Sequence, residues 1–194
     1  YTESLAQRPG VEQVLAELDG CEIRTGALSD DPQGGKTVTR GIRRRRREER
    51  WREVRVGLAR ALDEEDATYV ARLEKYPELV RRLFQAAVSR GLSSRSETII
   101  ITDGANGLME EMNSQFPNTT CILDQFHLLG HLYEMGDAMG LVDPERADWV
   151  RQTLARISRG ETPHVLRELR EIDGTGRDRA QRLVGYLDRF RGCV

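Results

Sequence analysis

Two stretches decide the fold: TIIITDG at residues 98–104 and CILDQFH at residues 121–127. Each contains a short apolar run followed by an aspartate. Consecutive β-branched residues without polar alternation are typical of a strand buried on both faces. Between the two stretches, residues 105–115 carry apolar side chains at helical spacing, and Phe116-Pro117 ends that pattern. We therefore expect a strand, a helix and a second strand parallel to the first.

Asp103 and Asp124 are the residues that follow these two predicted strands. Open sheets with parallel strands bind their ligands at the carboxyl ends of the strands. Two acids at neighbouring strand ends are therefore candidates for a functional site.

The composition is that of a globular chain with a large polar surface. Of 194 residues, 38% are hydrophobic and 32% are charged, and the formal net charge is −2. This length fits one domain, or one domain with a helical appendage. The net charge argues against a uniformly basic nucleic-acid binder, although one segment concentrates positive charge.

No apolar segment reaches the length of a membrane span, and no signal-peptide pattern is present at Tyr1. We therefore expect a cytoplasmic protein without a membrane partner. The three cysteines, Cys21, Cys121 and Cys193, are widely spaced, and we expect them to be reduced thiols in or near the core. The first residue is not methionine, so we expect the sequence to be a piece of a longer protein.

The N-terminal part predicts antiparallel strands. Residues 11–18 and 21–25 alternate apolar and polar side chains on either side of Asp19-Gly20, which favours a hairpin turned at that dipeptide. In the simplest interpretation Asp19 only forms the turn. A functional role for Asp19 requires a second acid nearby.

A basic run follows in a turn-rich segment. It consists of six arginines within eight positions: Arg40, Arg43, Arg44, Arg45, Arg46 and Arg47. Such a run can be a solvated loop. Guanidinium groups also bind phosphate bidentately and release counterions from nucleic acid, so this run is the candidate nucleic-acid-binding segment.

Further elements complete an α/β pattern. Residues 49–61 predict a third, half-exposed strand, and residues 77–88 predict an amphipathic helix. The pattern of residues 62–76, between them, does not decide between a helix, a strand and a loop. Three antiparallel strands followed by strand, helix, strand give a five-stranded mixed sheet flanked by helices, which is the element order of the ribonuclease H fold. In that topology the first and fourth strands are neighbours at the centre, which places Asp19 beside Asp103.

The rest of the chain predicts only helices, in residues 126–139, 145–158, 164–172 and 177–191. In the first of these helices we expect one buried face. That face would contain Phe126, Leu129, Leu132 and Tyr133.

Asp19 and Asp103 predict a metal site. Two adjacent carboxylates resist ionising together unless a cation lies between them. Oxygen ligands select hard cations such as Mg²⁺. Two such ions, roughly 3.5–4 Å apart, promote displacement at a phosphodiester. A third acid is normally needed to complete the second ion's ligands.

Asp124 and His127 form a separate feature, spaced to share one face of the following helix. Three interpretations stay open. Asp124 can be a helix N-cap beside a packed His127, or both residues can support the metal site from outside its ligands. The third interpretation is a zinc site made of Cys121, His127 and His131, which lacks a fourth ligand.

The chain resembles the catalytic core of DDE transposases of bacterial insertion sequences, on the Mutator-like branch. The resemblance covers roughly residues 11–190. It rests on the order and spacing of these motifs: ELDG at 17–20, WREVRVG at 51–57, TDGA at 102–105, FP at 116–117 and CILDQFH followed by His131-Leu132. In this family an acid and a histidine three residues later recur after the fifth strand, as do Asp124 and His127 here.

The resemblance implies a ribonuclease H-like domain that cuts transposon ends and joins them to target DNA with Mg²⁺ or Mn²⁺, as a homo-oligomer. Residues 1–10 would be a lead-in, 11–139 the first part of the core with a basic loop at 26–48, and 140–194 a helical insertion. The family's third acid is a glutamate on a helix after the insertion. Because Glu161, Glu168 and Glu171 lie within the insertion itself, we expect this fragment to lack that ligand and to be inactive.

Two alternatives remain. The first is a catalytically silent nucleic-acid-binding domain in which Arg40–Arg47 bind and the acids only cap turns. The second is a ribonuclease H-like nuclease that cuts without strand transfer.

Overall fold

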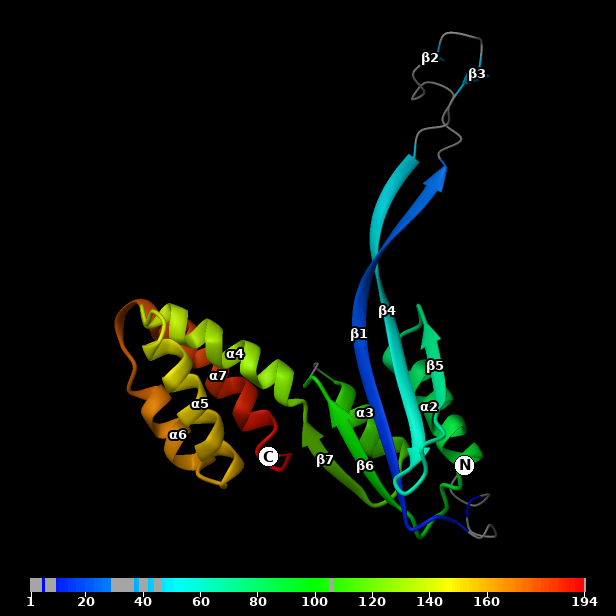
Figure 1. The fold of residues 1–194 in the computed structure, drawn as a ribbon. Coiled ribbons are helices and arrows are strands. Elements are labelled where there is room, and N and C mark those ends of the chain that lie inside the picture. The colour runs from blue at the N-terminus through cyan, green and yellow to red at the C-terminus, as the bar shows by residue number, and fades with distance from the viewer. Residues whose placement is uncertain are drawn as a thin grey trace.

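The computed structural model describes Leu5 and residues 10–28, 37–38, 42–43, 47–104 and 107–193. A twisted sheet with two helices forms one part of the molecule, and four helices beyond one edge of that sheet form the other (Figure 1). None of the helices in these ranges has the length and apolar character needed to cross a bilayer.

The sheet has five strands and mixes parallel and antiparallel pairs, as the sequence predicts. Its order is β5-β4-β1-β6-β7, and β1 pairs antiparallel with β4 and parallel with β6. The strands are β1 (Gln13–Leu28), β4 (Arg47–Ala61), β5 (Thr68–Arg72), β6 (Glu97–Thr102) and β7 (Thr119–Leu123). A separate two-stranded sheet pairs β2 (Thr37–Val38) with β3 (Ile42–Arg43).

The predicted hairpin turn at Asp19-Gly20 is wrong. β1 runs straight through this dipeptide and continues to Leu28. Asp19 lies opposite Val56, and the antiparallel ladder continues as far as the pair of Leu28 with Arg47. Pairing along the whole of β4 therefore outweighs the local turn preference of an Asp-Gly dipeptide. The result is a long two-stranded ribbon that projects beyond the rest of the sheet (Figure 1).

The second antiparallel partner comes from the segment whose structure the sequence leaves open. β5 pairs with residues 55–59, in the second half of β4, and forms the outer edge of the sheet. Only Val70 packs against the core, while Tyr69 keeps 69% of its surface exposed. A five-residue edge strand with one packed apolar side chain carries too weak an alternation to be found from sequence.

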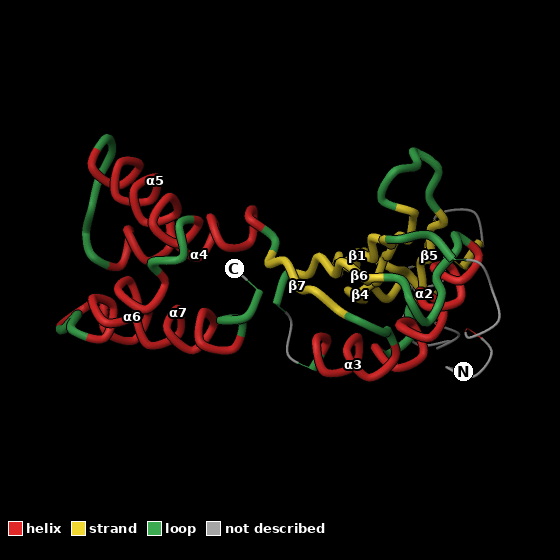
Figure 2. Tube along the Cα trace, turned by 90° about the horizontal axis from the view of Figure 1, so that it is seen from below, coloured by secondary structure: helices red, strands yellow, loops and turns green. Residues whose placement is uncertain are grey.

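One face of the sheet is covered by α2 (Tyr76–Ser89) and α3 (Leu108–Gln115). Figure 2 shows both helices on the same side of the strands. The predicted apolar face of α2 is confirmed, because Leu79, Leu83 and Phe84 are buried there. The core also contains Val14, Ala16 and Leu18 from β1, Ile100 from β6, and Leu108 and Met112 from α3.

Burial alternates along β6, whose sequence predicted a strand buried on both faces. Thr98, Ile100 and Thr102 are buried, whereas Ile99 and Ile101 are only partly buried. The second face of this strand is therefore open enough to carry a site.

The four predicted C-terminal helices are present and have a hydrophobic core of their own. They are α4 (Gln125–Ala138), α5 (Glu145–Ser158), α6 (Thr162–Arg170) and α7 (Arg177–Arg189), with a short 3₁₀ turn at Gly174–Gly176 before α7. The predicted buried face of α4 is partly wrong. Phe126 and Tyr133 are exposed, whereas Leu128, Leu132 and Met135 are buried, so the buried face of α4 is centred on these three residues.

The prediction of three reduced cysteines in or near the core is also wrong. Cys121 in β7 and Cys193 after α7 form a disulfide with a Cα–Cα distance of 4.6 Å, and Cys21 is an exposed free cysteine. Leu123 N donates a hydrogen bond to Cys193 O at 3.0 Å, so the chain after α7 pairs with β7. The two cysteines are 72 residues apart, and only the return of α7 to the sheet brings them together.

Most of the predicted nucleic-acid-binding run lies outside the described residues. Arg40 and Arg44–Arg46 belong to undescribed segments, and for Arg43 and Arg47 the structure gives only a backbone position, in β3 and β4.

Candidate metal centre

Asp19 and Asp103 are neighbours because their strands pair in parallel with matching register. The last pair of the β1–β6 ladder joins Leu18 to Thr102, and each aspartate is the next residue on its strand. Leu18 and Thr102 point into the core, and successive side chains of a strand alternate between the two faces. Both aspartates therefore lie on the face opposite α2 and α3, and they are neighbours, as their placement on adjacent strands predicts.

Asp124 begins α4 and holds His127 in place. Its backbone N donates a hydrogen bond to Thr102 O at 2.9 Å, which fixes the start of α4 next to the end of β6. Its Oδ1 accepts a hydrogen bond from Phe126 N at 2.8 Å, as an N-cap does. Its Oδ2 lies 2.8 Å from His127 Nδ1. Asp124 is thus both the predicted N-cap and a support for the histidine.

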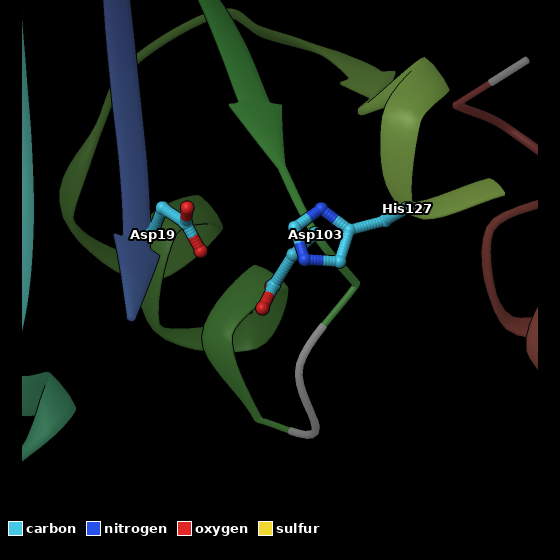
Figure 3. A group of neighbouring side chains, drawn as sticks. All are labelled: Asp19, Asp103 and His127. Carbon is cyan, nitrogen blue, oxygen red and sulfur yellow. The ribbon is translucent and has the colours of Figure 1, made fainter. Parts of the chain in front are cut away.

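Asp19, Asp103 and His127 form one cluster, shown in Figure 3. Each contributes a possible ligand atom, and these atoms all lie within 4.8 Å of one another. Asp19 and His127 are exposed, and Asp103 is half-buried. Three side chains from β1, from the end of β6 and from α4 therefore converge at one solvent-accessible point.

The carboxylates around His127 favour its charged form. Partial burial lowers the pKa of His127, but the hydrogen bond with Asp124 and the charges of Asp103, Asp124 and Asp19 outweigh that effect. The net pKa lies above the ordinary histidine value. A positive charge at this position is thus stabilised, which is the electrostatic property expected of a cation site.

The donor set fits one divalent cation. Two carboxylates suit Mg²⁺ or Mn²⁺, and an imidazole nitrogen is a good ligand for Mn²⁺ and weaker for Mg²⁺. Since Asp124 occupies Nδ1, His127 retains Nε2 for a metal, and a carboxylate on the other ring nitrogen is the usual support for such a ligand. The predicted site holds two metal ions and needs a third acid. Among the described residues, the cluster offers only these three ligands, which are too few for two ions.

The zinc site of Cys121, His127 and His131 is excluded by two contacts. The Cys121 sulfur is bonded to Cys193, so it is not a free thiolate. His131 Nδ1 lies 2.7 Å from Arg179 Nη2. Because an arginine can only donate, that nitrogen is already an acceptor.

The glutamates considered for a third ligand are engaged elsewhere or lie in the helical part. Glu161 pairs with Arg156 and Arg159, and Glu168 pairs with Arg156. Glu171 is an exposed residue directly after α6. Within the described part of the chain, no further acid joins Asp19 and Asp103 in the cluster.

The helix α7 supports the turn that carries Asp103. Tyr186 OH donates a hydrogen bond to Asp103 O at 3.1 Å. Gly104 has a φ of +84°, and a Cβ there would lie 2.8 Å from ring carbons of both Tyr186 and Phe190. Only glycine fits this contact without strain. Nothing in the sequence pointed to the contact between Gly104 and α7.

A cleft of ≈ 550 Å³ adjoins the cluster, and sequence reasoning missed it. Its walls include Asp103 and His127 of the candidate metal centre. Gly104 and residues of α4 and α7 form the remaining walls, and the helical residues include His131, Arg179, Arg182, Tyr186 and Arg189. The signal lay in the spacing of Arg179, Arg182 and Arg189, which recur every three or seven residues on one helix face.

Together, the cluster and the cleft form a site that combines acidic ligands with nearby cationic side chains. Such a site can hold a divalent cation beside an anionic substrate. No protein-family model matches the chain, and a search of curated proteins also finds no match.

Proposed function

We propose that the chain is the catalytic domain of a DNA transposase, in which divalent metal ions promote cleavage of transposon ends and their transfer to target DNA. The observation that carries the proposal is the convergence of Asp19, Asp103 and His127 within 4.8 Å at the carboxyl ends of two parallel strands. Paired carboxylates that share a divalent cation are the usual basis of metal-assisted phosphodiester chemistry.

The arrangement of the sheet supports a ribonuclease H-like core. The order β5-β4-β1-β6-β7 has three antiparallel strands followed by a parallel β6-α3-β7 unit, and β1 and β6 are neighbours. This is the topology expected of that fold, with Asp19 and Asp103 as its two central acids. We assign α4–α7 to the helical insertion of the transposase family.

Each residue has a defined part in the proposed site. Asp19 and Asp103 bind Mg²⁺ or Mn²⁺, and His127, held by Asp124, presents its second ring nitrogen to the same point. A divalent metal held by these residues would supply activation of the attacking oxygen and charge stabilisation of the leaving oxygen of the phosphodiester. The third acid of the family is not among the described residues at the cluster, so metal binding is the first property to test on this chain.

The proposed substrate is DNA, and the proposed assembly is a homo-oligomer. The arginine run Arg40–Arg47 follows β1 in sequence and ends at the first residue of β4, and the ribbon of these two strands projects from the sheet (Figure 1). A run of this kind is suited to phosphate contacts, and DNA affinity that depends on it should fall steeply with salt.

A joining assay with supercoiled plasmid tests the function. The full-length protein is incubated with transposon-end DNA and plasmid in Mg²⁺ or Mn²⁺, and products are separated by size. Joined products that disappear in Asp19→Asn and Asp103→Asn variants are expected. Cleavage without joining would identify a nuclease instead. DNA binding without either reaction would identify the silent binding domain.

A further inference from the structure

The disulfide between Cys121 and Cys193 lies in the wall of a second cleft. This cleft has a volume of ≈ 450 Å³, and both cysteines line it, together with residues such as Asn113 of α3 and Thr120 of β7. Both cysteines are only partly buried. A small dithiol can therefore reach the bond between them.

The bond also lies at the joint between the sheet and the helical part of the molecule. α4 begins directly after β7, and the core of the helical part reaches the sheet at Leu123 of β7 and Met109 of α3. The Cys121 sulfur lies 3.4 Å from the sulfur of Met109, and Leu123 N donates a hydrogen bond to Cys193 O. The disulfide thus fixes the segment after α7 beside β7 (Figure 1).

The tethered end of α7 contacts the turn that carries one candidate metal ligand. Cys193 N donates a hydrogen bond to Phe190 O at 2.8 Å, so the cysteine follows directly on the last turn of the helix. The rings of Phe190 and Tyr186 lie against Gly104, and Tyr186 OH donates to Asp103 O. These contacts form one packed path from the disulfide to Asp103, so releasing one end should loosen the other.

We propose that the Cys121–Cys193 disulfide is a site of thiol–disulfide exchange, and that its reduction by a dithiol frees the end of α7 and weakens cation binding at Asp19 and Asp103. The part of this inference that concerns the cation rests on the proposed function. It adds a form of regulation to that site.

The exchange takes place in two steps. A thiolate of the dithiol attacks one sulfur of the disulfide and forms a mixed disulfide, while the other cysteine leaves as a thiolate. The second thiol of the dithiol then displaces the first cysteine and closes a disulfide within the reagent. The dithiol loses two electrons and two protons, and the protein gains them as two thiols.

The metal centre should therefore depend on redox conditions. A reducing compartment keeps accessible disulfides open, and an oxidising one keeps them closed. In the closed form, the covalent bond adds to the non-covalent contacts that hold α7 at the Asp103 turn. His127 belongs to α4, which starts at the same joint, so a looser joint also affects its position relative to the two aspartates.

Amide hydrogen exchange, followed by NMR in EDTA, tests whether reduction frees the end of α7. After treatment with dithiothreitol, the amides of Leu123 and Gly104 should exchange at least about tenfold faster. The first donates to Cys193 O, and the second lies in the turn against Tyr186. The amide of Leu62, which donates to Gln13 O at the start of β1, is the internal control and should be unchanged.

Mn²⁺ binding, measured by electron paramagnetic resonance, tests the effect on the metal centre. The dithiothreitol is removed by anaerobic gel filtration before Mn²⁺ is added. The reduced chain should bind Mn²⁺ roughly tenfold more weakly than the oxidised chain. Cys121→Ser/Cys193→Ser should bind like the reduced chain with or without dithiothreitol. Cys21→Ser, at the exposed free cysteine, is the matched control and should respond to dithiothreitol as the wild type does.

Circular dichroism separates a switch from unfolding. Because the helical part has a hydrophobic core of its own, the reduced chain and the double variant should keep the helix content of the oxidised chain. A loss of helix content on reduction would make the disulfide a general support of the fold and would overturn the inference.

Two further results would overturn it. Equal exchange at Leu123 and Gly104 in both redox forms would show that the disulfide does not hold the end of α7. Equal Mn²⁺ affinity of the two forms would show that the tether and the metal centre are independent. If neither form binds Mn²⁺, the proposed metal site fails and the claim about the cation falls with it, while the exchange rates in EDTA still decide whether reduction frees α7.

Discussion

Asp124 is the residue on which the position and charge of His127 depend. It caps α4 through Oδ1 and holds His127 Nδ1 through Oδ2, both at 2.8 Å. From the sequence, Asp124 could be interpreted either as a helix N-cap or as an acid that supports the metal site. The structure combines the two functions, because the two oxygens of one carboxylate point in different directions.

Asp124→Asn should lower the pKa of His127. The amide can still cap the helix, but it removes a negative charge and a charged hydrogen-bond partner, both of which raise that pKa, while the effect of burial remains. The pKa of His127 can be followed by NMR titration of its ring protons. In the wild type it should lie above the ordinary value of about 6.5. A variant that titrates at the same pH as the wild type would contradict this assignment.

Gly104 and Gly107 form a matched pair for measuring the contact between α7 and the Asp103 turn. Both have positive φ values, +84° and +79°, but a Cβ at Gly104 meets two aromatic rings at 2.8 Å, whereas a Cβ at Gly107 meets nothing within 4 Å. Gly107→Ala should cost about 1 kcal/mol for the backbone alone. Gly104→Ala should cost that amount plus roughly 1–3 kcal/mol for overpacking. Urea unfolding measures both, and equal losses would show that the aromatic contact contributes nothing.

At the scale of elements, the local sequence of β1 predicts a turn, whereas its pairing with β4 keeps it a continuous strand. Asp19-Gly20 carries a strong turn signal, yet the β1–β4 ladder passes through it. The expected position of Asp19 beside Asp103 is nevertheless confirmed, because it depends only on the parallel register of β1 and β6. The pairing of β1 with β6 could be inferred from the element order of the ribonuclease H fold, whereas the length of the antiparallel ribbon could not.

The link between α7 and β7 predicts a dependence of stability on redox state. Cys121 and Cys193 are joined, so the oxidised chain should have one thiol that reacts with Ellman's reagent, on Cys21. Cys193→Ser should lower the free energy of unfolding by about 2–4 kcal/mol, as loss of a disulfide that closes a long loop does. Cys21→Ser is the control and should leave stability unchanged. Three reactive thiols in the native oxidised chain would refute the pairing.

At the scale of the whole molecule, the features that could be predicted from the sequence are those set by residues close together in the chain. The α/β class, the strands β1, β4, β6 and β7 and the C-terminal helices follow from periodicity within short windows, whereas β5 does not. The pair Asp19 and Asp103 follows from strand order. What could not be predicted depends on contacts between distant segments: the disulfide, the packing of Tyr186 on the Asp103 turn, and the cleft that α7 forms with α4.

The two parts of the molecule meet at the proposed site. β1 and β6 of the sheet supply the aspartates, and α4 and α7 of the helical part supply the histidine and the arginines. If α4–α7 form an insertion of the transposase kind, its first helix then contributes His127 to the metal centre.

The most direct test of this account is Mn²⁺ binding, measured by electron paramagnetic resonance of free and bound ion. The wild-type chain should bind Mn²⁺. Asp19→Asn and Asp103→Asn should each weaken binding by at least about tenfold, the effect expected even for loss of an outer ligand. Asp63→Asn, at an exposed acid after β4, is the control and should bind as the wild type does. Equal Mn²⁺ affinity in all four proteins would contradict the central claim that Asp19 and Asp103 share a metal ion.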